Sequence, residues 1–411
     1  MARLVFPSTK IPDGVSVSEW SDWTWQLRRS LKTQADFERF FDLSMGEQSA
    51  FSEGKELFNV RTTPYYATLA TQHSRSSDDP LRRILMPQEM ELHSGTQQML
   101  DPLGERRNQT SSRVIHRYSD RVLFLVTDIC SVYCRFCTRK HFTGQDQAFI
   151  RKDEYEKALS YISSHSGIRE VILSGGDPLT LSDTHLEKVI TDLRRIDHVE
   201  IIRVGTRMPV VAPMRVTDSL VRILRQGAPV FLMSHFNHPR ELTAEAAEAL
   251  TKLVDGGVPV MNQMVLLNGV NNHPAIVQAL SRRLLYLRVK PYYMFQCDPS
   301  IGTDHLRTSI DDSLEIQREL WGHLSGLAMP TYAVDIPDGG GKTVLTPNFE
   351  TARTESGRRY RGWDGVEADY VNPVGAKVSP ADAFLYEEEW ASLKNAKQNP
   401  APSTGAPDVH I

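Results

Sequence analysis

The chain has 411 residues, of which 40% are hydrophobic and 24% are charged, and its formal net charge is -4. This balance gives no electrostatic argument for a nucleic-acid or membrane-surface partner, and no run approaches the roughly 18 apolar residues of a transmembrane helix. The first residues, "MARLVFPSTKIPDGVSVSEW", lack a long apolar run followed by a small-residue cleavage site, so we expect no signal peptide and a cytoplasmic protein.

The first part of the chain, residues 1–110, is predicted to be a helical region. "SEWSDWTWQLRRSLKTQADFERFFDL" carries apolar and aromatic residues at helical spacing, and "DDPLRRILMPQEMEL" has a proline near a helix start.

Beyond this region, short apolar runs alternate with amphipathic helical stretches. Strands are predicted at "RVLFLV", "EVILSG", "EIIRVG", "PVFLMS", "PVMNQMVLL" and "VKPYYMF", with "PTYAVD" as a candidate seventh. A strand and a helix every 30–35 residues or so are typical of right-handed βαβ units with parallel strands. The pattern predicts an α/β fold, a partial (β/α)6 TIM-like barrel over residues 111–345. A C-terminal extension over residues 346–394 follows, and the tail 395–411, rich in Pro, Ala and Ser, is predicted to be disordered.

Three of the four cysteines lie within eight residues, as Cys130, Cys134 and Cys137 in a C-x3-C-x2-C pattern. Thiolates are the usual ligands of iron–sulfur clusters, and three on one loop leave the fourth iron of a cubane open. A structural zinc site normally has four ligands in paired units, whereas Cys297 lies 160 residues away. The pattern therefore predicts an iron–sulfur cluster.

Polar and glycine-rich segments follow the predicted strands, and active sites of such barrels lie at the carboxyl ends of the strands. One of these segments, "DGGGK", ends in Lys342 and lacks the spacing of a phosphate-binding P-loop. A lysine on a glycine loop can form a Schiff base with an aldehyde cofactor.

The segment "HRYSDRVLFLVTDICSVYCRFCTRKHFTG" resembles lysine 2,3-aminomutase and its relatives in the radical S-adenosylmethionine superfamily. The resemblance continues through "VILSGGDPL", "GTRMPVV", "SHFNHPREL", "QMVLLNGVN", "PYYMFQCD" and "DIPDGGGKTVL". With the N-terminal "WSDWTWQLR" and "TPYYATL" it covers the chain to about residue 350.

The resemblance implies three cofactors. The three clustered cysteines hold a [4Fe–4S] cluster, and its open iron binds S-adenosylmethionine. S-adenosylmethionine also lies close to the segment Ser174, Gly175, Gly176 and Asp177 and is contacted by His235. Pyridoxal 5'-phosphate is bound by the catalytic Lys342, with its phosphate near Arg117, Tyr118 and Arg207. Asp338 stands where the family usually has a further glycine, a change that can alter the geometry of the lysine loop.

The resemblance also implies a 2,3-aminomutase reaction that interconverts L-lysine and L-β-lysine. Arg139 is expected to bind the α-carboxylate, and Asp298 and Asp335 the ε-ammonium, an acidic pair that disfavours glutamate. L-Arginine is an alternative substrate, because its guanidinium also pairs with carboxylates and because Phe295 stands where lysine enzymes commonly have Tyr. A protein-bound lysine is a third alternative, which the long N-terminal region disfavours.

We expect the partners to be a small amino acid, an electron donor such as flavodoxin or ferredoxin, and further copies of the chain. Lysine enzymes of the familiar type bind zinc between subunits through a cysteine where this chain has His273, and no cysteine follows Cys297. We therefore expect no such zinc.

Overall fold

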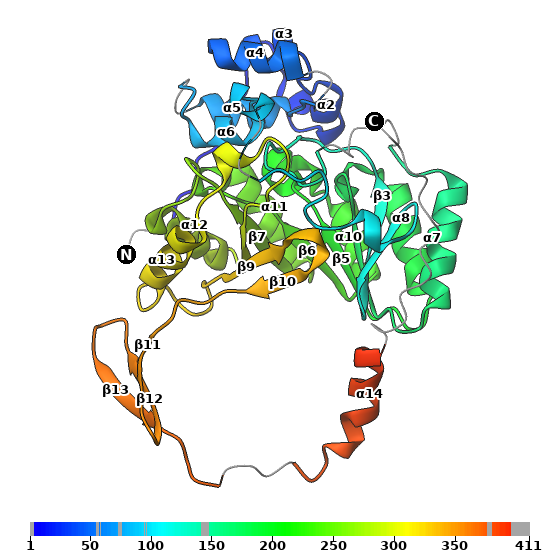
Figure 1. Ribbon diagram of the computed structural model, residues 1–411. Coiled ribbons are helices and arrows are strands. Elements are labelled where there is room, and N and C mark those ends of the chain that lie inside the picture. The colour runs from blue at the N-terminus through cyan, green and yellow to red at the C-terminus, as the bar shows by residue number, and fades with distance from the viewer. Residues whose placement is uncertain are drawn as a thin grey trace.

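The structure is a computed structural model that describes residues 4–54, 57, 59–72, 76–93, 95, 97–140, 148–375 and 380–395. A helical N-terminal region lies against a large sheet covered by helices, and a C-terminal extension projects away from both (Figure 1). None of the helices in these ranges is long and apolar enough to cross a membrane.

The N-terminal region consists of short helices, each begun by a Ser, Thr or Asp that accepts a hydrogen bond from a backbone N–H of the first turn. They are α1 (Val17–Trp20), α2 (Trp23–Arg28), α3 (Gln34–Glu38), α4 (Met45–Glu53), α5 (Pro64–Thr71) and α6 (Pro80–Leu85). Two 3-10 turns follow, η2 (Glu89–Leu92) and η3 (Arg106–Asn108). A strand, β1 (Gln109–Ser111), crosses the boundary predicted at 110/111.

Ten strands form one sheet in sequential order. After β1 and β2 (Val114–Tyr118), the parallel strands are β3 (Arg121–Thr127), β4 (Glu170–Gly175), β5 (Ile201–Gly205), β6 (Val230–Ser234), β7 (Val260–Leu266), β8 (Lys290–Gln296) and β9 (Thr331–Ile336). The last strand, β10 (Gly341–Val344), is antiparallel to β9. All six predicted strands and the candidate seventh are present, and the open strand order confirms a partial barrel.

The connecting helices cover one face of this sheet. They are α7 (Lys152–Ser164), α8 (Asp183–Arg194), α10 (Asp218–Gln226), α11 (Ala244–Asp255), α12 (Pro274–Tyr286) and α13 (Ile310–Leu320), with the short α9 (Met208–Val211) after β5. His273 begins α12, and its Nδ1 accepts a hydrogen bond from the N–H of Ala275 at 3.1 Å.

Burial alternates along the strands, as the two-residue period of a β-strand requires. In β7, Met264 and Leu266 are buried in the hydrophobic core, whereas Gln263 and Val265 are half-buried. The face of the sheet turned away from the core therefore remains partly accessible, as a substrate-binding barrel interior needs.

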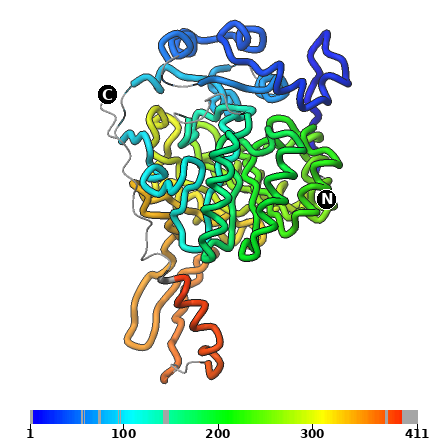
Figure 2. The backbone as a smooth tube through the Cα atoms, turned by 90° about the vertical axis from the view of Figure 1, so that its right-hand side faces the viewer, coloured from blue at the N-terminus to red at the C-terminus, as the bar shows by residue number. Residues whose placement is uncertain are grey.

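The C-terminal extension carries a separate three-stranded sheet, β11 (Glu350–Arg353), β12 (Gly357–Arg361) and β13 (Glu367–Val371), and helix α14 (Phe384–Asn395). Both lie clear of the barrel in two perpendicular views (Figures 1 and 2). Contacts between Trp363 and His323, and between Glu389 and Arg169, link the extension to the barrel. The tail predicted to be disordered lies outside the described residues, apart from Asn395 at the end of α14.

Candidate active site

The three clustered cysteines lie on the loop that follows β3, and all three are free thiols. Burial and the neighbouring thiols raise the pKa values of Cys130 and Cys137, so their deprotonation needs a nearby positive charge. The Arg207 guanidinium donates to Cys134 Sγ at 2.7 Å. In the part of the chain that the structure describes, no three His, Cys, Asp or Glu side chains converge as ligands of one metal ion would. Thiolates are the usual ligands of iron–sulfur clusters, and these three lie on one loop.

The glycines after β4 allow that strand to approach the cysteine loop. Gly175 has φ +114°, and a Cβ there would lie 2.2 Å from the carbonyl oxygen of Thr127. A Cβ on Gly176 would lie 2.2 Å from the carbonyl oxygen of Ile129, the residue before Cys130. Only glycine fits such close approach, so the pair fixes where the cysteine loop begins.

Asp177 has a role inside the fold. Its carboxylate accepts hydrogen bonds from Thr206 Oγ1 and the Arg207 N–H, both at 2.7 Å, and from the Leu179 N–H at 2.9 Å. The side chain is buried, which raises its pKa. Asp177 thus joins the ends of β4 and β5 and orients Arg207, and these contacts engage both of its oxygens.

Arg207 lies with the cysteines. Besides Cys134, its guanidinium contacts Glu241 Oε1 at 2.7 Å and the Tyr66 hydroxyl at 3.0 Å. The contacts of the Arg207 guanidinium are thus with Cys134, Glu241 and Tyr66, whereas Arg117 contacts Asp335.

His235 follows β6, and its ring stacks on Phe136, between the second and third cysteines, with ring centroids 5.4 Å apart. Its Nε2 is buried and has no hydrogen-bond partner among the described residues. Burial and the charge of Arg207 lower its pKa to about 3, so the ring is neutral. A buried nitrogen without a partner beside the cysteine loop is a position for a bound polar group.

A second group of predicted residues gathers at the β9–β10 hairpin, where Lys342 is paired in register with Asp335. Lys342 Nζ lies 3.1 Å from Asp335 Oδ2, and Arg117 Nη2 lies 3.1 Å from Asp335 Oδ1. The Tyr118 hydroxyl accepts a hydrogen bond from the Lys342 N–H at 3.0 Å. The Asp335 carboxylate therefore lies between two cations.

Asp338 lies in the turn of this hairpin with φ +58° and ψ +24°. This is the left-handed region, which favours glycine and which aspartate tolerates better than most residues. The departure from the family's glycine therefore preserves the turn that presents Lys342.

Asp298 follows β8 and contributes a second carboxyl group near Asp335. Burial and the nearby Asp335 carboxylate raise its pKa to about 7, against the opposing effects of Lys342 and Arg117. Its carboxylate makes no hydrogen bond or ion pair with any other described residue. Asp298 and Asp335 thus lie together, one without a partner and one already paired.

Arg139 and the segment 101–108 join the two groups. Arg139 Nη1 donates to Ser174 Oγ at 2.9 Å, and its Nε donates to Glu105 Oε2 at 2.8 Å. In the same segment, the Leu103 carbonyl accepts from Arg117 Nη1 at 3.2 Å. Glu105 was not predicted, because it lies in "DPLGERRN" with no motif around it.

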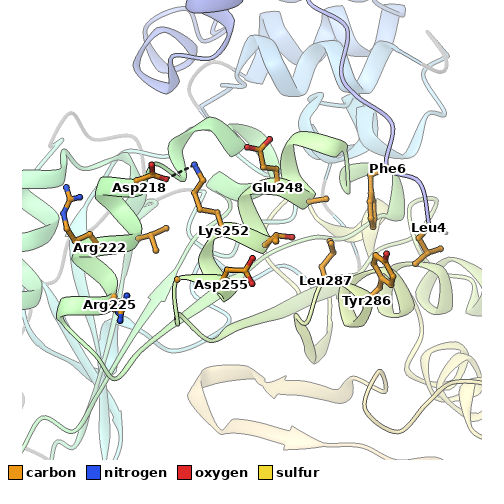
Figure 3. A pocket seen from close by; sticks show the side chains of 14 residues that line it. Leu4, Phe6, Asp218, Arg222, Arg225, Glu248, Lys252, Asp255, Tyr286 and Leu287 are labelled. Carbon is orange, nitrogen blue, oxygen red and sulfur yellow. Dashed lines mark ion pairs between the residues drawn. The ribbon is translucent and has the colours of Figure 1, made fainter.

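A pocket of about 920 Å³ lies elsewhere, on the outer surface of α10, α11 and α12 (Figure 3). Leu4, Phe6 and Tyr286 form its apolar end, and an ion pair between Lys252 and Asp218 crosses the other end. None of the predicted site residues lines it.

Comparison with known proteins identifies related sequences. The family described as Radical SAM superfamily matches residues 124–278, and Lysine-2,3-aminomutase matches residues 317–400. The chain is 41% identical to L-lysine 2,3-aminomutase of Fusobacterium nucleatum, over 91% of this chain and 87% of that one. It is also 41% identical to the Clostridium subterminale enzyme of that name (88% and 86%), and 38% identical to glutamate 2,3-aminomutase of Clostridioides difficile (84% and 82%).

The residues fit the cofactors of this family. Three thiols with an adjacent guanidinium and an unpartnered His235 nitrogen suit a cluster with S-adenosylmethionine. The amine of Lys342 and the Arg117 guanidinium both contact Asp335, and the Lys342 backbone N–H donates to Tyr118, a set of groups that suits pyridoxal phosphate. The chain belongs to the lysine 2,3-aminomutase family of radical S-adenosylmethionine enzymes, which use a [4Fe–4S] cluster, S-adenosylmethionine and pyridoxal 5'-phosphate.

Proposed function

We propose that the protein interconverts L-lysine and L-β-lysine, and that Asp298 and Asp335 bind the side-chain ammonium of the substrate. The observation that carries this proposal is the Lys342 ammonium 3.1 Å from Asp335. The acidic pocket already accommodates the end group of a lysine side chain.

The charge of the pocket supports the same substrate. Asp298 and Asp335 repel each other, and this repulsion contributes to the raised pKa of Asp298. The ε-ammonium of lysine restores the balance, whereas the side chain of glutamate adds a third negative charge.

The remaining residues are proposed to position the other end of the substrate and the cofactors. Arg139 binds the α-carboxylate, Lys342 holds pyridoxal phosphate, and Arg117 and Tyr118 lie at its phosphate. The thiols of the cysteine loop hold the cluster, with His235 and the segment from Ser174 to Asp177 beside S-adenosylmethionine. When bound, these groups supply a radical that removes a substrate hydrogen atom and a π-system across which the amino group moves.

An anaerobic assay with the cluster reconstituted and both other cofactors present tests this proposal. L-Lysine, L-arginine and L-glutamate are offered separately, and the products are resolved by mass spectrometry; we expect β-lysine. β-Arginine as the product would mean that arginine is the substrate. Phe295, whose ring centroid is 5.1 Å from Lys342 Nζ, would then be the residue to substitute next. Cleavage of S-adenosylmethionine with no amino-acid product would overturn the proposal in favour of a protein-bound lysine.

We also propose that the enzyme is a cytoplasmic homo-oligomer that receives electrons from a separate donor such as flavodoxin or ferredoxin. A three-stranded sheet without its own core is marginally stable. Large apolar side chains of the extension are exposed, among them Trp363, Tyr370, Phe384 and Trp390. A second copy of the chain would cover them. Light scattering on the intact protein measures the subunit number, and a monomer would contradict this proposal of a homo-oligomer.

The fourth cysteine, Cys297, has no cysteine neighbour in sequence, so a second cluster of this kind for electron relay is not encoded.

A further inference from the structure

The carboxylate of Glu91, in η2 of the N-terminal region, is fully buried between two cations. Glu91 Oε1 accepts from Arg135 Nε at 2.8 Å, and Oε2 accepts from Arg135 Nη2 at 2.6 Å. Lys140 Nζ donates to the same Oε2 at 3.1 Å. The side chains of Arg135 and Lys140 are 0% and 1% exposed, so one carboxylate balances two buried charges.

Both cations belong to the loop that carries the cysteines. Arg135 directly follows Cys134, and Lys140 is three residues beyond Cys137. Other bonds of this loop reach the same N-terminal region: the Arg135 N–H donates to the Ile84 carbonyl at 3.0 Å, and the Tyr133 N–H donates to the Arg61 carbonyl at 3.0 Å. These hydrogen bonds therefore fix the cysteine loop to the N-terminal region.

The loop after β8, which carries Asp298, meets the same cluster of charges. Lys140 Nζ also donates to the Gly302 carbonyl at 3.3 Å. The neighbouring Ile301 N–H donates to Met99 O at 3.2 Å, so this loop too is fixed to the N-terminal region. Glu91 thus lies where the cysteine loop and the loop with Asp298 come together.

Removal of this carboxylate has a specific consequence. Arg135 and Lys140 would lose the carboxylate that both of them contact, and loss of one partner from a buried ion pair is strongly destabilising. The loop would relieve this by moving one of the two cations toward water, and this movement would displace Cys134 or Cys137.

We propose that Glu91 is a positioning residue for the iron–sulfur cluster, which acts through Arg135 and Lys140 to hold the cysteine loop in its ligand-binding path. The variant Glu91→Gln removes the charge and nearly preserves the shape. Loss of supporting groups outside a metal's own ligands typically weakens metal retention about 10- to 100-fold. We expect iron release from anaerobically reconstituted E91Q to a chelator to be faster by a factor in that range, with less iron and sulfide per chain.

The pair Glu47–Arg82 offers a matched control. It is a bidentate, fully buried pair in the same N-terminal region, with Arg82 Nε 2.8 Å from Glu47 Oε1, but Arg82 lies in α6 and outside the cysteine loop. Glu47→Gln is expected to lower thermal stability with a smaller acceleration of iron release than E91Q, because Arg82 is not part of the cysteine loop, although Ile84 of the same helix contacts this loop. Iron release from E91Q at the unaltered rate overturns the proposal, and so does equal iron loss from E47Q, since the effect would then be one of general stability.

A second variant tests the proposal if E91Q does not fold. Lys140→Met keeps the Glu91–Arg135 pair and removes one of the two contacts between Glu91 and the loop. We expect an intermediate acceleration of iron release and an altered electron paramagnetic resonance signal of the reduced cluster. Unchanged iron release and an unchanged signal in K140M would contradict the proposal.

Discussion

Lys342 Nζ and the Asp335 carboxylate lie 3.1 Å apart because the β9–β10 hairpin pairs these two residues directly across the strands. The lysine that is expected to hold the aldehyde cofactor thus lies against the carboxylate that is expected to hold the substrate ammonium. Arg117 contacts the same carboxylate at 3.1 Å, so Asp335 already binds cationic groups in this structure.

The pH dependence of lysine binding should report Asp298. Its pKa is raised to about 7, so below pH 7 it is protonated and the pocket carries one negative charge fewer than above pH 7. We expect KM for L-lysine to fall as the pH rises through about 7, and this change to be absent in Asp298→Asn. Steady-state kinetics between about pH 6 and 9 measure it. An unchanged pH profile in D298N would show that another group titrates.

The same raised pKa makes a prediction for stability. A carboxyl group whose folded-state pKa exceeds its unfolded value favours folding below the unfolded pKa, near 4, and this contribution is lost as the pH rises through about 7. Asp298→Asn should therefore make the cofactor-free protein more stable than the unaltered protein at pH 8, with little difference at pH 4. Denaturant unfolding at the two pH values tests the sign.

Lys342 should be the residue that binds the aldehyde cofactor. Borohydride reduction of the protein incubated with pyridoxal phosphate should attach the cofactor to the peptide that contains Lys342, as mass spectrometry of digested protein would show. Lys342→Ala should abolish this modification while the iron content is retained, because the cysteine loop makes no contact with the hairpin through Lys342. Labelling of another lysine in the unaltered protein would contradict the assignment.

The turn at Asp338 should tolerate glycine and reject a branched residue. At φ +58°, Asp338→Gly relieves a steric strain of the folded state but also raises the conformational entropy of the unfolded state. Because these two effects oppose each other, we expect the free energy of unfolding to change by less than about 1 kcal/mol, with cofactor binding preserved. Asp338→Val should cost more than that and weaken pyridoxal phosphate binding, because the turn presents Lys342. Unfolding curves and cofactor titration of the two variants measure the difference. Equal behaviour of D338G and D338V would argue against a strict need for the left-handed conformation.

The contact between Arg207 and Cys134 should set the cluster potential. A cation 2.7 Å from a ligand sulfur stabilises the added electron of the reduced cluster. Arg207→Met should shift the reduction potential to a more negative value, as redox titration followed by electron paramagnetic resonance would show. A potential equal to that of the unaltered protein, at equal iron content, would exclude this role.

The sequence predicted the elements whose signals are local. The strands appeared as apolar runs at regular spacing, and Cys130, Cys134, Cys137 and Lys342 lie in short motifs. It did not predict contacts that depend on distant packing. Glu91 contacts Arg135 from 44 positions away, and Glu105 contacts Arg139 from 34 positions away. Each is a single acidic residue in a polar stretch, where no period or motif distinguishes a buried carboxylate from a solvated one.

The same limit applies to Arg207. Its motif after β5 indicated a cation at the carboxyl end of the sheet. Its contacts with Glu241 and Tyr66 depend on the fold, and the sequence did not predict them.

We propose that the acidic pair selects lysine. A competition tests this, in which the reconstituted enzyme is given equal amounts of L-lysine, L-arginine and L-glutamate under anaerobic conditions and the β-amino products are quantified by mass spectrometry. We expect β-lysine as the dominant product, with Asp298→Asn reducing its yield more than that of any other product. β-Glutamate as the main product would contradict it, since the Asp298–Asp335 pair would then not be the side-chain site.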